Sequence, residues 1–280
     1  MQTPDIEDNT MMPTRPVGLF LVIVAIFVAT QGLAMLIPES GRAAAIIVTQ
    51  LVVFLGGAYV YRKHFSRPET TWPTLRRLGM SPWALVMVII TSVSLGFLAS
   101  ALGGMTIQLF PALGEMADSY QQGMESLLLP EPLYAQILGA VAVAIVAPVA
   151  EEYLFRGTIL AEQCNDQIAV SAILLNGILF SVMHFNPVAF VSLAVVGCYF
   201  AHITVRSDGL WGAVVGHAAL NFVNGVVLIR VVEDAPAPEE LAFAEIGVML
   251  VILIPVTSLL WWSSVRMIGA SDGDGDEASP

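Results

Sequence analysis

The chain contains eight apolar stretches, each long enough or nearly long enough to cross a lipid bilayer. A membrane-spanning helix needs about 20 mostly apolar residues. Hydrophobic residues make up 56% of the chain and charged residues only 12%, whereas a soluble domain carries roughly twice that charged fraction. We therefore expect an all-α polytopic membrane helical bundle. Its eight or so transmembrane helices are expected at roughly residues 17–37, 43–61, 83–106, 134–160, 168–185, 188–205, 209–232 and 242–262.

The basic residues indicate the orientation of the bundle, because cytoplasmic loops of membrane proteins carry an excess of Lys and Arg. The loop after the second span holds five of the eleven basic residues: Arg62, Lys63, Arg67, Arg76 and Arg77. With this loop in the cytoplasm, nine of the eleven lie on or near the inside, and only those at positions 42 and 230 lie outside. We therefore expect both termini in the cytoplasm and a multi-pass location in a cell membrane of the prokaryotic cytoplasmic type.

The segments outside the spans are polar. Residues 1–16 are expected to form a cytoplasmic tail, and residues 17–265 the transmembrane domain. Residues 266–280 are acidic and rich in Gly and Ser, a composition typical of a disordered tail. Residues 111–132 are too polar to span and predict an interfacial helix or loop. The two cysteines offer neither a disulfide framework nor metal-ligand spacing.

Three charged residues lie within the fourth predicted span, where each charge costs several kcal/mol unless it is paired or hydrated. Glu152 and Arg156 are four residues apart, which favours an ion pair on one helix face. Glu151 points elsewhere, about 100° round the helix from Glu152. Its carboxylate must therefore find a partner on another helix or remain desolvated, and a carboxylate in that position is a candidate general base.

Two later spans each carry a histidine with a partner four residues away. The fifth span has Phe180 and His184, and the seventh has His217 and Asn221. An imidazole beside a carboxylate can share the proton of an attacking water, and an imidazole beside a carboxamide suits a developing oxyanion. No Ser or Cys is obviously paired with a base, which favours an activated water over a covalent intermediate.

Simpler interpretations of these residues remain open. The two glutamates and Arg156 could form only a buried structural ion pair, and each histidine could be a satisfied core residue. Two Glu and two His could also bind zinc, although they are spread over three helices and lack the H-E-x-x-H spacing. We expect no metal and no other cofactor.

The three patterns, taken in order, resemble the motifs of a known protease family. They read Glu151-Glu152-x-x-x-Arg156, Phe180-x-x-x-His184 and His217-x-x-x-Asn221, and the first continues as Phe155-Arg156-Gly157. This combination resembles the CAAX protease and bacteriocin-processing (CPBP, or Abi) family, which includes the type II CAAX prenyl endopeptidases. The resemblance is confined to a motif core at residues 147–224. Each motif alone is weak, but three in order, each on a predicted span, are specific.

The resemblance implies a glutamate-dependent intramembrane endopeptidase that requires no metal. By matching positions, Glu151 and His184 would activate the water, while His217 and Asn221 would form the oxyanion hole. The supporting residues would be Glu152, Arg156 and Phe180.

The substrate would be a peptide or protein at the membrane, and prenylated CAAX-type peptides are one class that the resemblance includes; no nucleic acid would be involved. Two other functions stay open, namely a non-catalytic immunity or scaffold protein and a proton-coupled transporter, in which Glu151 and the histidines would carry protons. The motifs identify neither the substrate nor the oligomeric state.

The predicted depth of His184 leaves two arrangements, because this residue comes at the outer end of a short fifth span. Either the fourth and fifth helices both protrude into the cytoplasm, or the hairpin after His184 turns back partway through the bilayer. We favour the first. Both place the site in a cavity open to the cytoplasm.

Overall fold

The computed structural model describes residues 14–34, 36–66, 68, 70–71, 73, 78–164, 170–233 and 243–270. Every element in these ranges is a helix. The first helix begins at Thr14 and the last continues to Ala270, so residues 266–270 belong to a helix and not to the predicted tail. The rest of both predicted tails, residues 1–13 and 271–280, lies outside the described residues.

The helices fall into eight long segments and one that lies crosswise. In several segments α-helical stretches run directly into wider π-helical ones, and these carry η labels. In chain order the elements are α1 (Thr14–Ala34), α2 (Glu39–Thr49), η1 (Gln50–Gly56), α3 (Gly57–His64), α4 (Pro82–Leu109), η2 (Pro111–Leu113), α5 (Gly114–Leu128), α6 (Leu133–Val141), η3 (Ala142–Val146), α7 (Ala147–Leu154), η4 (Phe155–Leu160), α8 (Ala161–Gln163), α9 (Val170–Met183), α10 (Phe190–Ser207), α11 (Trp211–Leu220), η5 (Asn221–Val227), α12 (Leu228–Glu233) and α13 (Phe243–Ala270).

Six of the eight predicted spans are confirmed as helices long and apolar enough to cross a membrane. They are Glu39–His64, Pro82–Leu109, Leu133–Gln163, Phe190–Ser207, Trp211–Arg230 and Phe243–Ile268. The other two predicted spans correspond to shorter apolar helices, Pro16–Thr30 within α1 and Val170–Met183. Among the described residues the chain is therefore a multi-pass helical protein, and the full count of eight crossings stays a prediction.

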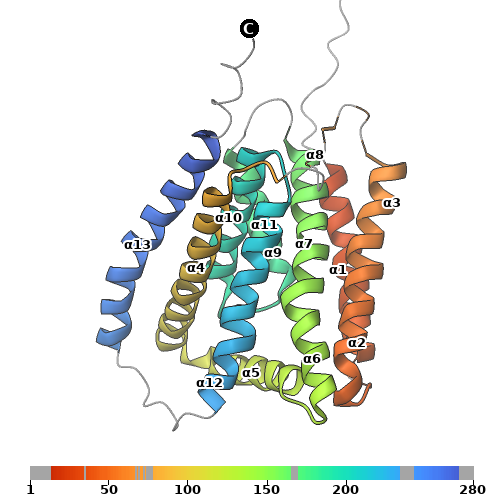
Figure 1. Cartoon of the computed structure of the whole chain (residues 1–280). Coiled ribbons are helices and arrows are strands. Elements are labelled where there is room, and N and C mark those ends of the chain that lie inside the picture. The colour runs from red at the N-terminus through yellow and green to blue at the C-terminus, as the bar shows by residue number, and fades with distance from the viewer. Residues whose placement is uncertain are drawn as a thin grey trace, which may run out of the picture.

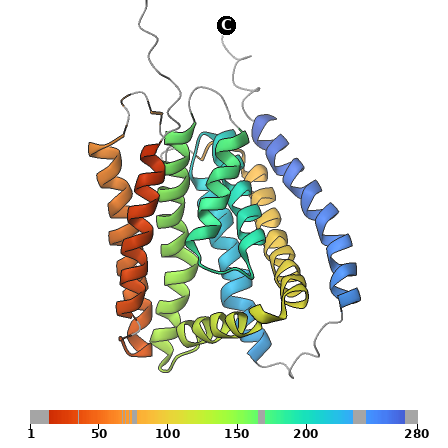
Figure 2. The ribbon, with the colours of Figure 1, turned by 180° about the vertical axis from the view of Figure 1, so that it is seen from behind.

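The long helices stand side by side, and α1 begins at the same end of the bundle at which α13 finishes (Figures 1 and 2). The predicted basic loop starts from this end, where α3 terminates in Arg62, Lys63 and His64. At the opposite end α5 lies across the bundle (Figure 1), so the polar segment 111–132 does contain a helix, and its position at the membrane interface stays a prediction. The arrangement is compatible with both termini in the cytoplasm, which remains a prediction.

Helix α4 occupies the interior, between α13 on one side and α10 and α11 on the other. The Ser81 hydroxyl caps its start by accepting a hydrogen bond from the amide of Ala84 (3.2 Å), and Pro82 occupies the first turn, where its missing N–H costs nothing. The core combines buried side chains of α4, α7, η4, α9, α10 and α11. These six elements form the frame that holds the motif residues.

The hairpin of α9 and α10 is shorter than the bundle. Helix α9 has 14 residues, a length of about 21 Å, which is less than the roughly 30 Å hydrocarbon core of a bilayer. It ends at a turn where Phe185 adopts a left-handed φ of 49°. Figures 1 and 2 show this turn partway along the bundle. The start of α9 and the end of α10, at the opposite end of the hairpin, lie level with the ends of the neighbouring helices. The hairpin therefore turns back partway along the bundle. Its depth in a bilayer, and with it our favoured arrangement in which the fourth and fifth helices protrude into the cytoplasm, stays a prediction.

Two glycines let α9 and α10 approach closely. A Cβ on Gly177 would lie 2.5 Å from the Cys198 sulfur and 2.6 Å from the Ala194 carbonyl oxygen, and a Cβ on Gly197 would lie 2.8 Å from the Gly177 Cα. Backbone atoms cannot move aside as a flexible side chain does. The close contact therefore sets where α9 ends, and with it the position of His184.

We expect Gly177→Ala to destabilise the protein by about 1–3 kcal/mol, because overpacking forces the two helices apart. The midpoint of thermal unfolding in detergent measures the effect. Gly103→Ala is the matched control, since a Cβ there meets only Val188 Cγ1 at 3.8 Å. Equal midpoints for the two variants would contradict the close contact.

Candidate active site

Glu152 connects the first and third motifs. Its Oε1 atom accepts hydrogen bonds from Arg156 Nη1 (2.7 Å) and from His217 Nδ1 (2.8 Å), which lies on α11. All three side chains are buried. The expected pair between Glu152 and Arg156 is present, and the same oxygen also orients His217. Because Nδ1 carries the shared proton, Nε2 is the nitrogen that His217 presents to other groups.

Arg156 is completely buried and makes contacts in two directions. Its Nη2 donates to the Gly197 carbonyl oxygen (2.9 Å), and its guanidinium carbon lies 4.6 Å from the centre of the Phe180 ring. One cation therefore ties α10 and the second motif to Glu152. Since an unpaired charge at this depth is costly, the positions of these groups depend on one another.

Glu151 finds its partner on another helix. Its Oε1 accepts a hydrogen bond from Gln50 Nε2 (3.0 Å) in η1, and its Oε2 lies 4.0 Å from His217 Nε2. The side chain is 12% exposed, whereas Glu152 is fully buried. The two adjacent glutamates thus approach opposite nitrogens of the same imidazole, and Glu151 is the one with limited access from outside.

Phe180 packs between the two motif histidines, with its ring 4.7 Å from that of His184 and 5.7 Å from that of His217. His184 Nδ1 donates to the Phe180 carbonyl oxygen (2.8 Å) at the end of α9, which leaves Nε2 as the acceptor nitrogen of the ring. Among the described residues the structure gives no hydrogen bond between His184 and Glu151. Their cooperation in activating a water stays a prediction.

Asn221 lies one turn after His217, at the start of η5. One N–H of its carboxamide donates to the carbonyl oxygen of Val143 (3.0 Å), in η3 of the neighbouring helix. This bond fixes the plane of the amide, and the second N–H of the same nitrogen can serve a ligand.

Four π-helical stretches surround this cluster and each supplies one of its groups. Gln50 begins η1, Asn221 begins η5, the Val143 carbonyl belongs to η3, and Arg156 belongs to η4. Wide turns of this kind are frequent at functional sites, where they free a carbonyl and rotate the following side chains. In η4 the Thr158 hydroxyl donates to the Tyr153 carbonyl oxygen, five residues earlier (3.0 Å).

Three groups that contact the motif residues were not predicted from the sequence. Gln50 had one signal, a polar residue in the middle of an otherwise apolar span, but its partner lies 101 residues away. Phe200 of α10 stacks on His217, with ring centres 5.4 Å apart and an interplanar angle of 21°. The backbone carbonyl of Val143 could not be identified from the sequence, because every residue has a backbone carbonyl.

Helix α5 approaches the cluster from the end of the bundle. Burial, and after it the negative charge of Glu151, raises the pKa of the Tyr120 phenol. About half of Tyr120 is nevertheless exposed on the surface of the bundle.

The described residues contain no cluster of side chains that would support the zinc alternative. Within the described ranges, no group of three or more His, Cys, Asp and Glu side chains could hold a metal ion together.

Comparison with known families finds one match. Residues 133–223 match the sequence model of the family described as type II CAAX prenyl endopeptidase Rce1-like. This part of the chain is therefore similar to that CAAX protease family. The match starts at the first residue of α6 and ends within η5, so it contains all three motifs. No curated protein and no solved structure matches the chain.

The match confirms the resemblance to the CAAX protease family that was drawn from the motifs. The matched region covers less than half of the chain. It leaves out α1–α5, α12 and α13, and therefore also Gln50.

Proposed function

We propose that this chain is a glutamate-type intramembrane endopeptidase that hydrolyses a peptide bond by means of an activated water. The observation that carries the proposal is the buried chain of contacts from Gln50 through Glu151, His217 and Glu152 to Arg156. A structural ion pair needs only the last three groups. The additional carboxylate, oriented by an amide and partly accessible, is the part that suits a general base.

Glu151 is the base in this mechanism. Gln50 donates a hydrogen bond to Oε1 of Glu151, so Oε2 is the carboxylate oxygen that faces the reacting water. His184 Nε2 is the second acceptor for the water, because its Nδ1 is occupied by the Phe180 carbonyl. The water oxygen attacks the carbonyl carbon of the substrate, and its proton passes to Glu151.

Asn221 and His217 stabilise the oxyanion that results. Asn221 offers its second N–H, while Val143 keeps the amide in place. His217 must carry a proton on Nε2 to act as a donor, and the carboxylate of Glu152 at Nδ1 favours the resulting imidazolium. When the tetrahedral intermediate collapses, the C–N bond breaks and the proton taken by Glu151 moves to the departing amine.

The substrate is a membrane-associated peptide, with prenylated CAAX-type peptides as the class suggested by the family description. The predicted orientation presents the site to the cytoplasmic side of a cell membrane. We propose this location together with the activity.

A panel of membrane-presented fluorogenic peptides, prenylated and unprenylated, tests the proposal on purified protein in liposomes. We expect cleavage by the wild type, and a loss of about 10²–10³-fold in kcat for Asn221→Ala, the size typical of removing one oxyanion donor. Binding of peptides without cleavage would favour the scaffold alternative. Uptake driven by a pH gradient, without cleavage, would favour the transporter.

We expect Gln50→Leu to lower kcat by about tenfold or more with little change in KM, because it removes the hydrogen bond that orients Glu151 and leaves substrate contacts intact. Gln121→Leu is the control, since Gln121 bonds only Glu125 on the exposed face of α5 (2.9 Å). Kinetics on a cleaved peptide measure both constants. An unchanged kcat would mean that Gln50 does not position the base.

A further inference from the structure

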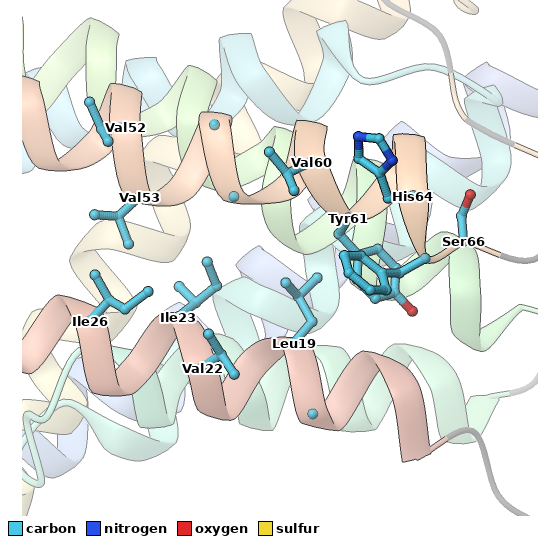
Figure 3. Close-up of a pocket in the computed structure, with 14 residues that line it drawn as sticks. Leu19, Val22, Ile23, Ile26, Val52, Val53, Val60, Tyr61, His64 and Ser66 are labelled. Carbon is cyan, nitrogen blue, oxygen red and sulfur yellow. The ribbon is translucent and has the colours of Figure 1, made fainter.

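A large apolar groove lies away from the candidate active site, between α1 and the helix formed by η1 and α3. Its volume is about 980 Å³, at the upper end of the range for ligand-binding pockets. Figure 3 shows Ile23 and Ile26 of α1 facing Val53 across the gap, with His64 and Ser66 at one end. The groove is open to the outside of the bundle, where Val22 is 56% exposed.

Glycines create this space. Gly18, Gly56 and Gly57 line the groove. A Cβ on Gly57 would lie 2.6 Å from Ile23 Cδ1, so this glycine lets the helices approach. A Cβ on Gly18 would have no neighbour within 4 Å, and one on Gly56 would meet only the Leu51 carbonyl of its own helix at 3.4 Å. The two helices thus come close at Gly57, and the space beside Gly18 and Gly56 is not filled by side chains.

The ends of the groove differ in polarity. The lining toward Ile26 and Val52 is apolar, whereas the other end has Tyr61, His64 and Ser66. Lys63, in the last turn of α3, lies outside the lining; it is exposed, and its Nζ is 6.0 Å from the centre of the Tyr59 ring. An apolar slot that ends beside an exposed cationic side chain near the membrane surface matches a chain with an anionic head.

We propose that this groove binds one acyl chain of an anionic glycerophospholipid, whose phosphate lies beside Lys63 and His64 at the end of α3. Charge complementarity selects this occupant over a partner helix, because basic side chains at the membrane surface attract anionic head groups. By the distribution of basic residues the lipid comes from the cytoplasmic leaflet. The site is separate from the proposed catalytic groups and does not depend on the proposed function.

Native mass spectrometry of the full-length protein in detergent tests the site, with dioleoylphosphatidylglycerol and dioleoylphosphatidylcholine as probes. The wild type should retain phosphatidylglycerol in preference. The double variant Gly18→Leu/Gly56→Leu should reduce its retention by at least about tenfold, because leucine side chains occupy the slot. Gly247→Leu on α13 is the control, since a Cβ there also has no neighbour within 4 Å.

The head-group part of the site is tested separately by Lys63→Gln. We expect it to weaken retention of phosphatidylglycerol about fivefold and to leave phosphatidylcholine unchanged. If the double variant fails to fold, Gly18→Leu alone fills the open side of the groove. Equal retention of the two lipids by the wild type would overturn the proposal, as would undiminished retention by the filled variants.

Discussion

Glu151→Gln is expected to lower kcat for peptide hydrolysis by about 10³-fold or more while the protein stays folded. Removal of a general base typically costs 10²–10⁴-fold. The substitution keeps the size of the side chain and keeps an oxygen that can accept the hydrogen bond from Gln50. What it removes is the ability to take a proton from water. The measurement is single-turnover kinetics on a cleaved peptide, with the thermal midpoint recorded in parallel.

Glu162→Gln provides the matched control for this variant. Glu162 is also a buried carboxylate on the same continuous helix, but it accepts a hydrogen bond from Thr70 (3.1 Å), away from the motif residues. We expect its kcat to remain within about threefold of the wild type, since it removes no group of the site. If Glu151→Gln is as active as Glu162→Gln, the general base is not Glu151.

Arg156→Met is expected to give the largest loss of stability, about 3–5 kcal/mol, because it removes one partner of a buried ion pair. The Glu152 carboxylate would keep only His217 as a partner, and the Gly197 carbonyl would lose its donor. Methionine retains most of the apolar volume, so the loss reflects charge and hydrogen bonding. The thermal midpoint in detergent measures the change.

Arg266→Met is the control for Arg156→Met. Arg266 lies on the exposed side of α13 and contacts the Trp262 ring, with 4.3 Å between its guanidinium carbon and the ring centre. An exposed contact of this type contributes about 0.5–1 kcal/mol. Similar midpoints for the two variants would show that the buried cation does not hold the bundle together.

Contacts within one helix could be predicted from the sequence. Apolar length located the spans, and the four-residue spacing predicted the pair between Glu152 and Arg156, because both features depend only on local geometry. The amphipathic segment that became α5 was predicted for the same reason. Family motifs then added the grouping of the three spans, which the match at residues 133–223 bears out at the level of the family.

Contacts between helices could not be predicted in this way. The bond from Gln50 to Glu151 and the bond from Asn221 to Val143 depend on how helices far apart in the chain are packed. The π-helical turns add to the difficulty, since they rotate side chains away from the angles of a regular helix. The turn after His184, partway along the bundle, could not be predicted either, because hydropathy gives the length of a helix and not where a hairpin turns back.

Mass spectrometry of the reaction products in ¹⁸O-water tests the central claim most directly. Wild-type protein in liposomes should convert a membrane-presented peptide into two fragments, with one ¹⁸O atom in the new carboxyl group after a single turnover. The Glu162→Gln variant should give the same products, and the Glu151→Gln variant should give none. Labelled fragments formed by Glu151→Gln at the wild-type rate would contradict the account.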